Sequence, residues 1–208
     1  MFKYDKKIDI WSKKMIKNLD KVWGNKIPKN KNNSKSLTSP FLIIYLNRYF
    51  NKYGKKIFAR FNKLTSLSYK INDFDYYINN TPVSLHNSKK SYISISQYHS
   101  FNKYPAVIIH EISHIYFYNY INSKKFLKFN NISKTSDLIS EKERNELKEI
   151  ITVIINKEFA NIIDRLDEGY PNHKNIREKI FNLWIKENIN FDEWVAEVIK
   201  IYKKEVVN

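Results

Sequence analysis

The most constraining feature of the sequence is residues 105–120, PAVIIHEISHIYFYNY, where apolar residues occur on every side of a helix. A helix that is apolar all round is buried in the protein interior. Pro105 suits the first turn of such a helix. The same segment carries His110, Glu111 and His114, and burying such groups is unfavourable unless they are paired or bound to a metal ion. The segment therefore predicts a buried helix with a polar site built into it.

These polar residues form an HExxH motif, His110-Glu111-Ile112-Ser113-His114. Positions i and i+4 lie on one face of a helix, so both imidazoles can reach one metal ion. Glu111 is rotated by about 100° from His110, which places it beside a metal-bound water rather than on the metal. Zinc lowers the pKa of such a water to near 7, and a neighbouring carboxylate can take its proton. Chance would produce the motif only about 0.007 times in a chain of this composition.

The absence of cysteine narrows the chemistry of this site. A chain of 208 residues without cysteine has no disulfide, no thiolate-ligated zinc and no cysteine nucleophile. A zinc ion (Zn2+), the expected cofactor, is then held by histidine and carboxylate groups. No apolar stretch resembles a secretory leader, and none approaches the roughly 20 residues of a membrane span. We therefore expect a cytoplasmic location and no transmembrane segment.

The charge of the chain is strongly positive, with 37 basic and 21 acidic side chains and a formal net charge of +16. Such a balance suggests nucleic acid or an anionic membrane as a partner. Only five of the basic residues are arginine, however, and nucleic-acid sites favour arginine for its planar, bidentate fork. We attribute most of the charge to a bias in overall composition, and we do not expect nucleic acid to be the partner.

The N-terminal part is predicted to be an amphipathic helix followed by a linker. Apolar side chains in residues 2–23 repeat with helical spacing. Residues 24–40 are polar and rich in turn-forming residues. These patterns divide the chain into an N-terminal attachment, residues 1–40, and a single domain, residues 41–208.

Within this domain, a helix and then a small sheet are expected. The helix begins after Pro40 and ends at Gly54. Residues 56–98 are rich in aromatic and β-branched residues with partial alternation, which predicts three or four strands, beginning with residues 56–64. The connections are short and favour antiparallel pairing in an antiparallel or mixed sheet. Residues 91–98, SYISISQY, are typical of an edge strand.

The C-terminal half is predicted to be helical. Ser140 and Glu143 form a capping-box pattern before a long helix over residues 141–167. Two further helices are expected near residues 173–187 and 191–205. Strands followed by helices indicate the α+β class. We expect the small sheet to pack on the HExxH helix.

The motif and its surroundings resemble the zincin metallopeptidases. HEISH on a helix, after an edge-type strand and before a helix that carries a glutamate, is most similar to the gluzincins, such as thermolysin. The resemblance covers about residues 56–168. It implies a zinc-dependent hydrolase of peptide bonds with a peptide or protein substrate, which pairs with the edge strand. The metzincin extension is absent, because Phe117 and Tyr120 occupy its Gly and His positions, and the aminopeptidase motif GxMEN is absent too.

The resemblance implies a glutamate as the third zinc ligand, and two candidates follow the motif. In the gluzincin pattern NExxSD, Glu149 takes the ligand position and Thr152 the serine position. Glu158 lies nine residues later, about 180° around the helix, so both cannot face the metal. Helical periodicity slightly favours Glu158, and the motif favours Glu149. We take Glu149 as the expected ligand and keep Glu158 as the alternative.

The same pattern leaves open which carboxylate supports a zinc-binding histidine. Val153 occupies the acidic position of NExxSD. Asp164 and Asp167 are candidates for a supporting carboxylate, and weaker candidates for direct ligands.

A zinc peptidase also needs a donor for the oxyanion of the tetrahedral intermediate. Tyr170 and His173, in the turn after the long helix, are the best candidates, and Arg177 is another. His86 and His99 lie in loop-like contexts and are expected to be ordinary surface histidines.

The sequence therefore predicts a zinc metallopeptidase with His110, His114 and Glu149 as ligands. Glu111 is expected to act as general base and then as proton donor to the leaving amine. The alternative interpretation is a lysine-rich protein that binds nucleic acid or an anionic membrane and has a structural or vestigial metal site.

Overall fold

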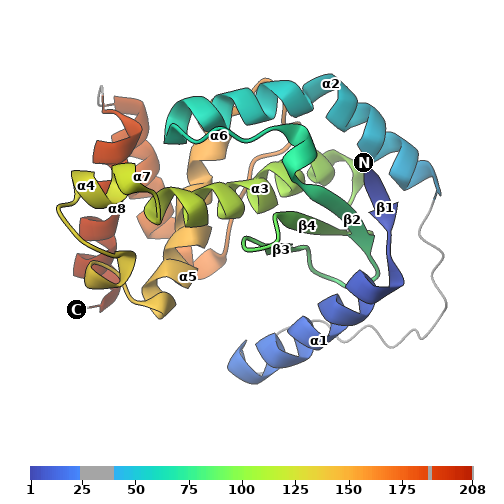
Figure 1. Ribbon diagram of the computed structural model, residues 1–208, viewed down its shortest axis with the longest axis horizontal. Helices are drawn as coiled ribbons and strands as arrows, with labels where there is room; N and C mark the ends of the chain where they lie inside the picture. Colours follow the sequence, from blue (N-terminus) through green and yellow to red (C-terminus); the bar gives the residue numbers. More distant parts are fainter. Residues whose placement is uncertain (24–39, 187–188, 208) are drawn as a thin grey trace.

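The computed structural model describes residues 1–23, 40–186 and 189–207 (Figure 1). Helices dominate, and one small mixed sheet gives the α+β class that the sequence predicts. The sheet has four strands in the order β1-β2-β4-β3. The strands are β1 (Phe2–Tyr4), β2 (Asp75–Asn79), β3 (Leu85–Asn87) and β4 (Tyr92–Ser96).

The strands of this sheet run mostly in parallel. β1 pairs with β2 and β2 pairs with β4 in parallel, and only β3 is antiparallel to its neighbour β4. The predicted antiparallel pairing therefore holds only for the shortest connection. The predicted edge strand is also wrong, because β4 lies between β2 and β3. The edge strands of the described sheet are β1 and β3, and β3 directly precedes β4 in the chain.

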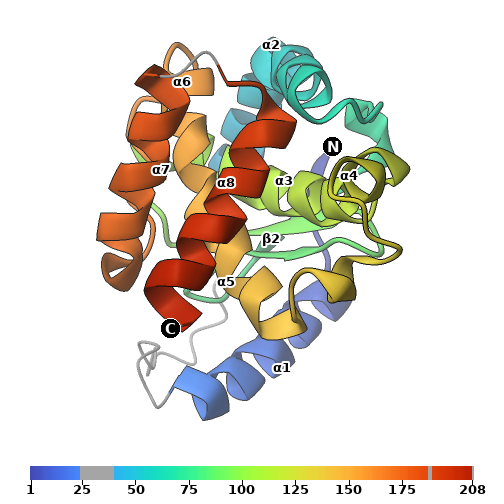
Figure 2. The same ribbon diagram turned by 90° about the vertical axis from the view of Figure 1, so that its left-hand side faces the viewer.

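Helices cover both faces of the sheet, and the C-terminal helices form the end of the molecule away from the sheet (Figures 1 and 2). The helices are α1 (Lys6–Trp23), α2 (Pro40–Thr65), α3 (Tyr104–Ile121), α4 (Lys124–Phe129), α5 (Glu141–Ile150), α6 (Ile155–Glu158), α7 (Lys174–Lys186) and α8 (Phe191–Tyr202). A 3-10 segment, Ile151–Ile154, joins α5 to α6, and a π-helical turn, Lys203–Val207, follows α8.

Alternation along the strands decides which helices cover which face. Ile93 of β4 lies opposite Tyr76 of β2, and this face looks toward α2, where Phe50 packs on Tyr76. Tyr92 belongs to the opposite face, and Trp11 of α1 packs against its ring. Helix α3 contacts β3, β4, α2 and α5, which explains why its sequence is apolar all round.

The N-terminal prediction needs one correction. The helix predicted from residue 2 begins at Lys6, because residues 2–4 form β1. Phe2 is buried against Phe50 and Tyr76. A three-residue strand is too short to show alternation, so only its pairing with β2 reveals it. The predicted linker, apart from Pro40, lies outside the described residues.

Helix α2 does not end at Gly54, and the strand predicted at residues 56–64 is helical instead. Ile57, Phe58 and Phe61 are buried and lie on one helical face. Gly54 serves packing rather than termination, because a Cβ there would lie 2.5 Å from Ile71 Cδ1.

The predicted helix over residues 141–167 is too long. Its capping box forms as predicted between Ser140 and Glu143, but regular helix ends at Glu158. The chain then continues without regular helix or strand to Tyr170, and Gly169 adopts a positive φ of 65°. Helices α3, α7 and α8 occur close to their predicted ranges.

Candidate metal centre

Helix α3 presents three of the predicted site residues on adjoining turns. The ring centroids of His110 and His114 lie 4.4 Å apart, as expected for residues one helical turn apart. Glu111 and His114 are buried, with exposed fractions of 7% and 2%, and His110 is half-buried. Because α3 packs against the sheet and against other helices, it holds these groups away from bulk water.

Glu149, near the C-terminal end of α5, brings a carboxylate to both imidazoles. Its Oε2 lies 3.3 Å from His110 Nε2, and its Oε1 lies 3.4 Å from His114 Nε2. The three ligand atoms all lie within 4.8 Å of one another, so His110, His114 and Glu149 could hold one metal ion. Two nitrogens and one carboxylate are a ligand set that suits zinc and several other divalent metals.

The alternative ligand, Glu158, lies elsewhere. Its Oε1 accepts a hydrogen bond of 2.8 Å from Trp184 Nε1, and its carboxylate pairs with Arg60. Only 2% of its side chain is exposed. Glu158 belongs to neither of the groups of described residues that could hold a metal ion.

Asp167 supplies the carboxylate behind His110. Its Oδ1 lies 3.0 Å from His110 Nδ1, and its Oδ2 accepts a hydrogen bond of 2.7 Å from Thr152 Oγ1. Val153, which occupies the acidic position of the motif, is buried in the core instead. A carboxylate on the far nitrogen of a ligand histidine fixes the orientation of its ring.

Arg177 holds this carboxylate in position. The buried guanidinium donates to Asp167 Oδ2 at 2.7 Å, to Thr152 Oγ1 at 2.6 Å and to the main-chain oxygen of Glu149 at 2.7 Å. Gly169 is required beside it, because a Cβ there would lie 2.6 Å from the guanidinium. These contacts engage Arg177 within the protein, so it is no longer a good candidate for an oxyanion donor.

The charges in this group stabilise one another. Burial lowers the pKa of His110, but the hydrogen bond and charge of Asp167, followed by those of Glu149, outweigh it and raise that pKa well above its usual value. Burial raises the pKa of Glu149, but the charge of His114 and the hydrogen bonds of both imidazoles hold that pKa well below its usual range. Burial lowers the pKa of His114 to about 4. In the metal-free site, His110 is therefore the protonated imidazole.

His86 is a site residue that sequence reasoning missed. It lies on β3 opposite Ile93 of β4, and this register turns its side chain toward α3. Its Nδ1 lies 3.0 Å from Glu111 Oε2, and burial lowers its pKa to about 3. His86, Glu111 and His114 form a second group that could hold a metal ion. His86 is placed at the site by the pairing of β3 with β4, and sequence patterns do not define the connection between these strands.

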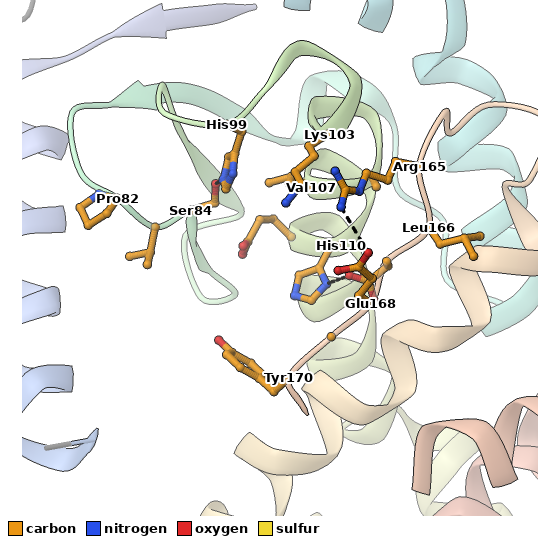
Figure 3. Close-up of a pocket in the computed structure, with 15 residues that line it drawn as sticks. Pro82, Ser84, His99, Lys103, Val107, His110, Arg165, Leu166, Glu168 and Tyr170 are labelled. Atoms are coloured by element: carbon orange, nitrogen blue, oxygen red, sulfur yellow. Dashed lines mark hydrogen bonds and ion pairs between the residues drawn. The ribbon is translucent and has the colours of Figure 1, made fainter. Parts of the chain in front are cut away.

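A cavity of about 300 Å3 lies beside His110 and Glu111 (Figure 3). Ser84 and His99 are in its wall, with 3.1 Å between Ser84 Oγ and His99 Nε2. His99, predicted as a surface residue, is half-buried here. The cavity is lined by Pro82, Val83, Ser84, His99, Lys103, Ala106, Val107, His110, Glu111, Arg165, Leu166, Asp167, Glu168, Gly169 and Tyr170.

The two predicted oxyanion donors differ in position. Tyr170 lines the cavity, and burial, followed by the charges of Glu149 and Glu111, raises the pKa of its hydroxyl. The hydroxyl therefore keeps its proton at neutral pH and can donate it in a hydrogen bond. His173 lies next to Tyr170, with ring centroids 5.9 Å apart, and is not among the residues that line the cavity.

Comparisons with known proteins provide no family for the chain, since no family model, no curated protein and no solved structure matches it. No helix among the described residues is long and apolar enough to cross a membrane.

Proposed function

We propose that this protein is a zinc-dependent metallopeptidase of the gluzincin type. The observation that carries the proposal is the convergence of His110, His114 and Glu149 beside a buried glutamate and an open cavity. Three protein ligands leave a fourth coordination position for water or substrate, which distinguishes catalytic from structural zinc sites. When bound, zinc would polarise the peptide carbonyl and make a water molecule acidic enough to react near neutral pH.

Glu111 is the proposed general base. It follows the first ligand histidine on α3, and its carboxylate lines the cavity. Burial raises its pKa, which suits a group that first takes a proton from water and then returns that proton to the leaving amine. His86 Nδ1 contacts one carboxylate oxygen and fixes the side chain in place.

Asp167 and Tyr170 have supporting roles in this proposal. Asp167 accepts from His110 Nδ1 and so directs Nε2 toward the ligand position. Tyr170 lines the cavity with a protonated hydroxyl and is the proposed donor to the oxyanion. His173 is the weaker candidate, because it is not among the residues that line the cavity.

The sheet offers a place for an extended peptide. β3 is one of the two edge strands of the sheet formed by the described residues, and one of its sides has no strand partner there. A substrate strand can pair with such an edge through main-chain hydrogen bonds. His86 of β3 contacts Glu111, so a peptide on this edge would lie close to the proposed base.

The test compares Glu111→Gln with the wild type after both are loaded with zinc. Glu111→Gln removes the base but no proposed ligand, so we expect zinc to be retained and peptide hydrolysis to fall by about 10²- to 10⁴-fold. Hydrolysis is followed by mass spectrometry of a diverse peptide mixture. Glu178→Gln, an exposed residue on α7, is the matched control and should leave hydrolysis unchanged. Undiminished hydrolysis by Glu111→Gln would overturn the assignment of the base.

A further inference from the structure

The cavity beside the candidate metal centre contains a cation without a counter-ion among the described residues. We propose that this cavity binds a carboxylate of the peptide substrate through Lys103, with Arg165 beside it. The inference rests on the proposed peptidase function and names the substrate class: peptides with a carboxylate, of a side chain or of the C-terminus, close to the cleaved bond.

A comparison of the charges that line the cavity singles out Lys103. Asp167 is paired with Arg177 at 2.7 Å, and Glu111 Oε2 is hydrogen-bonded to His86 Nδ1 at 3.0 Å. Arg165 and Glu168 form an ion pair of 3.3 Å at the rim. Lys103, which is half-buried, has neither an ion pair nor a side-chain hydrogen bond within the described part of the chain. A ligand carboxylate would therefore meet a charge that none of these protein groups neutralises.

The position of Lys103 sets the distance from the reaction. It is the N-cap residue of α3 and precedes His110 by seven residues, which corresponds to about 10 Å along the helix axis. An extended peptide advances about 3.3 Å per residue, so the ammonium group can reach a side chain within about three residues of the cleaved bond. Figure 3 shows Lys103 and Arg165 on one side of His110, with Tyr170 on the other. A carboxylate at Lys103 would thus lie on the other side of His110 from the proposed oxyanion donor.

The rest of the wall suits the stem of an acidic side chain. Val83, Ala106 and Val107 line the same cavity and offer apolar contacts to methylene groups. The carboxylate could belong to an Asp or Glu side chain or to the C-terminus of the peptide, and the experiment separates these sources.

The experiment starts from the peptides that the zinc-loaded wild type cleaves in a randomised mixture. We expect Asp or Glu to be enriched at one position within three residues of the cleaved bond. Matched peptides with Glu or Gln at that position, each with a free or an amidated C-terminus, are then compared by kcat/KM. A side-chain subsite predicts a preference of about tenfold or more for Glu at either terminus. A preference that follows the free C-terminus instead identifies the terminal carboxylate as the bound group.

Lys103→Met tests the residue itself. It should abolish the preference for the carboxylate, so that the ratio of kcat/KM between the acidic and the neutral peptides falls to about one. Lys90→Met, an exposed lysine outside the cavity, is the matched control and should keep the preference. Equal cleavage of all four peptides by the wild type, or an equal loss for all four in Lys103→Met, would overturn the proposal.

A binding measurement tests the carboxylate site independently of the proposed peptidase activity. The fluorescently labelled Glu and Gln peptides are titrated with the Glu111→Gln protein to measure their affinity. If the wild type cleaves no peptide, heptapeptides of random composition are used instead. Tighter binding of the acidic peptides that depends on Lys103, without any hydrolysis by the wild type, supports the carboxylate site and contradicts the peptidase. Hydrolysis without selectivity in either assay supports the peptidase and contradicts the carboxylate site.

Discussion

At the scale of single residues, the contact of 3.0 Å between His86 Nδ1 and Glu111 Oε2 links two possible metal positions. His114 belongs to both groups that could hold a metal ion, and Glu111 is a ligand in only one of them. If the metal occupies the group with Glu149, Glu111 stays free to act as a base. If the metal occupies the group with His86, Glu111 is a metal ligand and is not available as a base.

His86→Ala separates these two arrangements. With the metal at His110, His114 and Glu149, the variant should keep one zinc ion per chain and lose part of its activity, by about tenfold, because Glu111 is less well positioned. Zinc content is measured by atomic emission, and kcat on a peptide that the wild type cleaves. His99→Ala, which alters a cavity histidine outside both groups, is the control for zinc content. Loss of zinc from His86→Ala would place the metal in the second group.

The charge of His110 makes zinc binding depend on pH. Asp167 and Glu149 raise its pKa in the metal-free protein, whereas burial lowers the pKa of His114 to about 4. Below the pKa of His110, zinc must therefore displace one proton from the site, and not two. The apparent zinc affinity should rise about tenfold per pH unit as the pH increases toward that pKa, and then level off. Competition with a chromophoric chelator from pH 6 upward measures it, and a flat profile would contradict the assignment.

At the scale of elements, the 3-10 segment Ile151–Ile154 explains why helical periodicity could not choose the third ligand. A 3-10 helix turns by about 120° per residue and an α-helix by about 100°. Four such residues add about 80° of rotation between Glu149 and Glu158. The angle between the two side chains therefore differs from that calculated for an unbroken α-helix. The motif match does not depend on that rotation, and it favours the glutamate that lies beside the histidines.

Glu158→Gln and Glu149→Gln should therefore have opposite effects. Glu158→Gln keeps an acceptor for Trp184 but loses the charge that faces Arg60. Because Arg60 is partly exposed, we expect a loss of about 1–2 kcal/mol in the free energy of unfolding, with zinc affinity unchanged. Glu149→Gln should weaken zinc binding by more than about tenfold and leave the fold intact. Urea denaturation and zinc titration measure the two quantities, and weaker zinc binding in Glu158→Gln alone would reverse the assignment.

The sequence predicts α3, the capping box of α5 and the two C-terminal helices, but it misassigns residues 56–64 and the end of the helix that begins at Glu141. The buried helix α3 follows from its own apolar pattern and Pro105. In contrast, β1 and β3 have three residues each, too few for a periodic signal, and both depend on partners far along the chain. Sequence patterns alone leave Asp167 as one candidate among others, because its position depends on the early end of α6 and on Arg177.

At the scale of the whole molecule, the site joins elements from both halves of the fold. The sheet contributes His86, α3 contributes the HExxH motif, and the C-terminal helices and the segment after α6 contribute Glu149 and Asp167. Figure 1 shows α3 running from the sheet to the group of C-terminal helices. Because the ligands come from α3 and α5, a bound metal would connect the two halves and stabilise the native state relative to the unfolded chain.

The most direct test of the proposed metal site is the zinc content of the purified, zinc-loaded protein after removal of loosely bound metal. The wild type should retain one zinc ion per chain, and His110→Ala and Glu149→Gln should retain little or none. The native fold of each variant is checked by circular dichroism. A wild type that binds no zinc, or a His110→Ala variant with undiminished zinc content, would contradict the account.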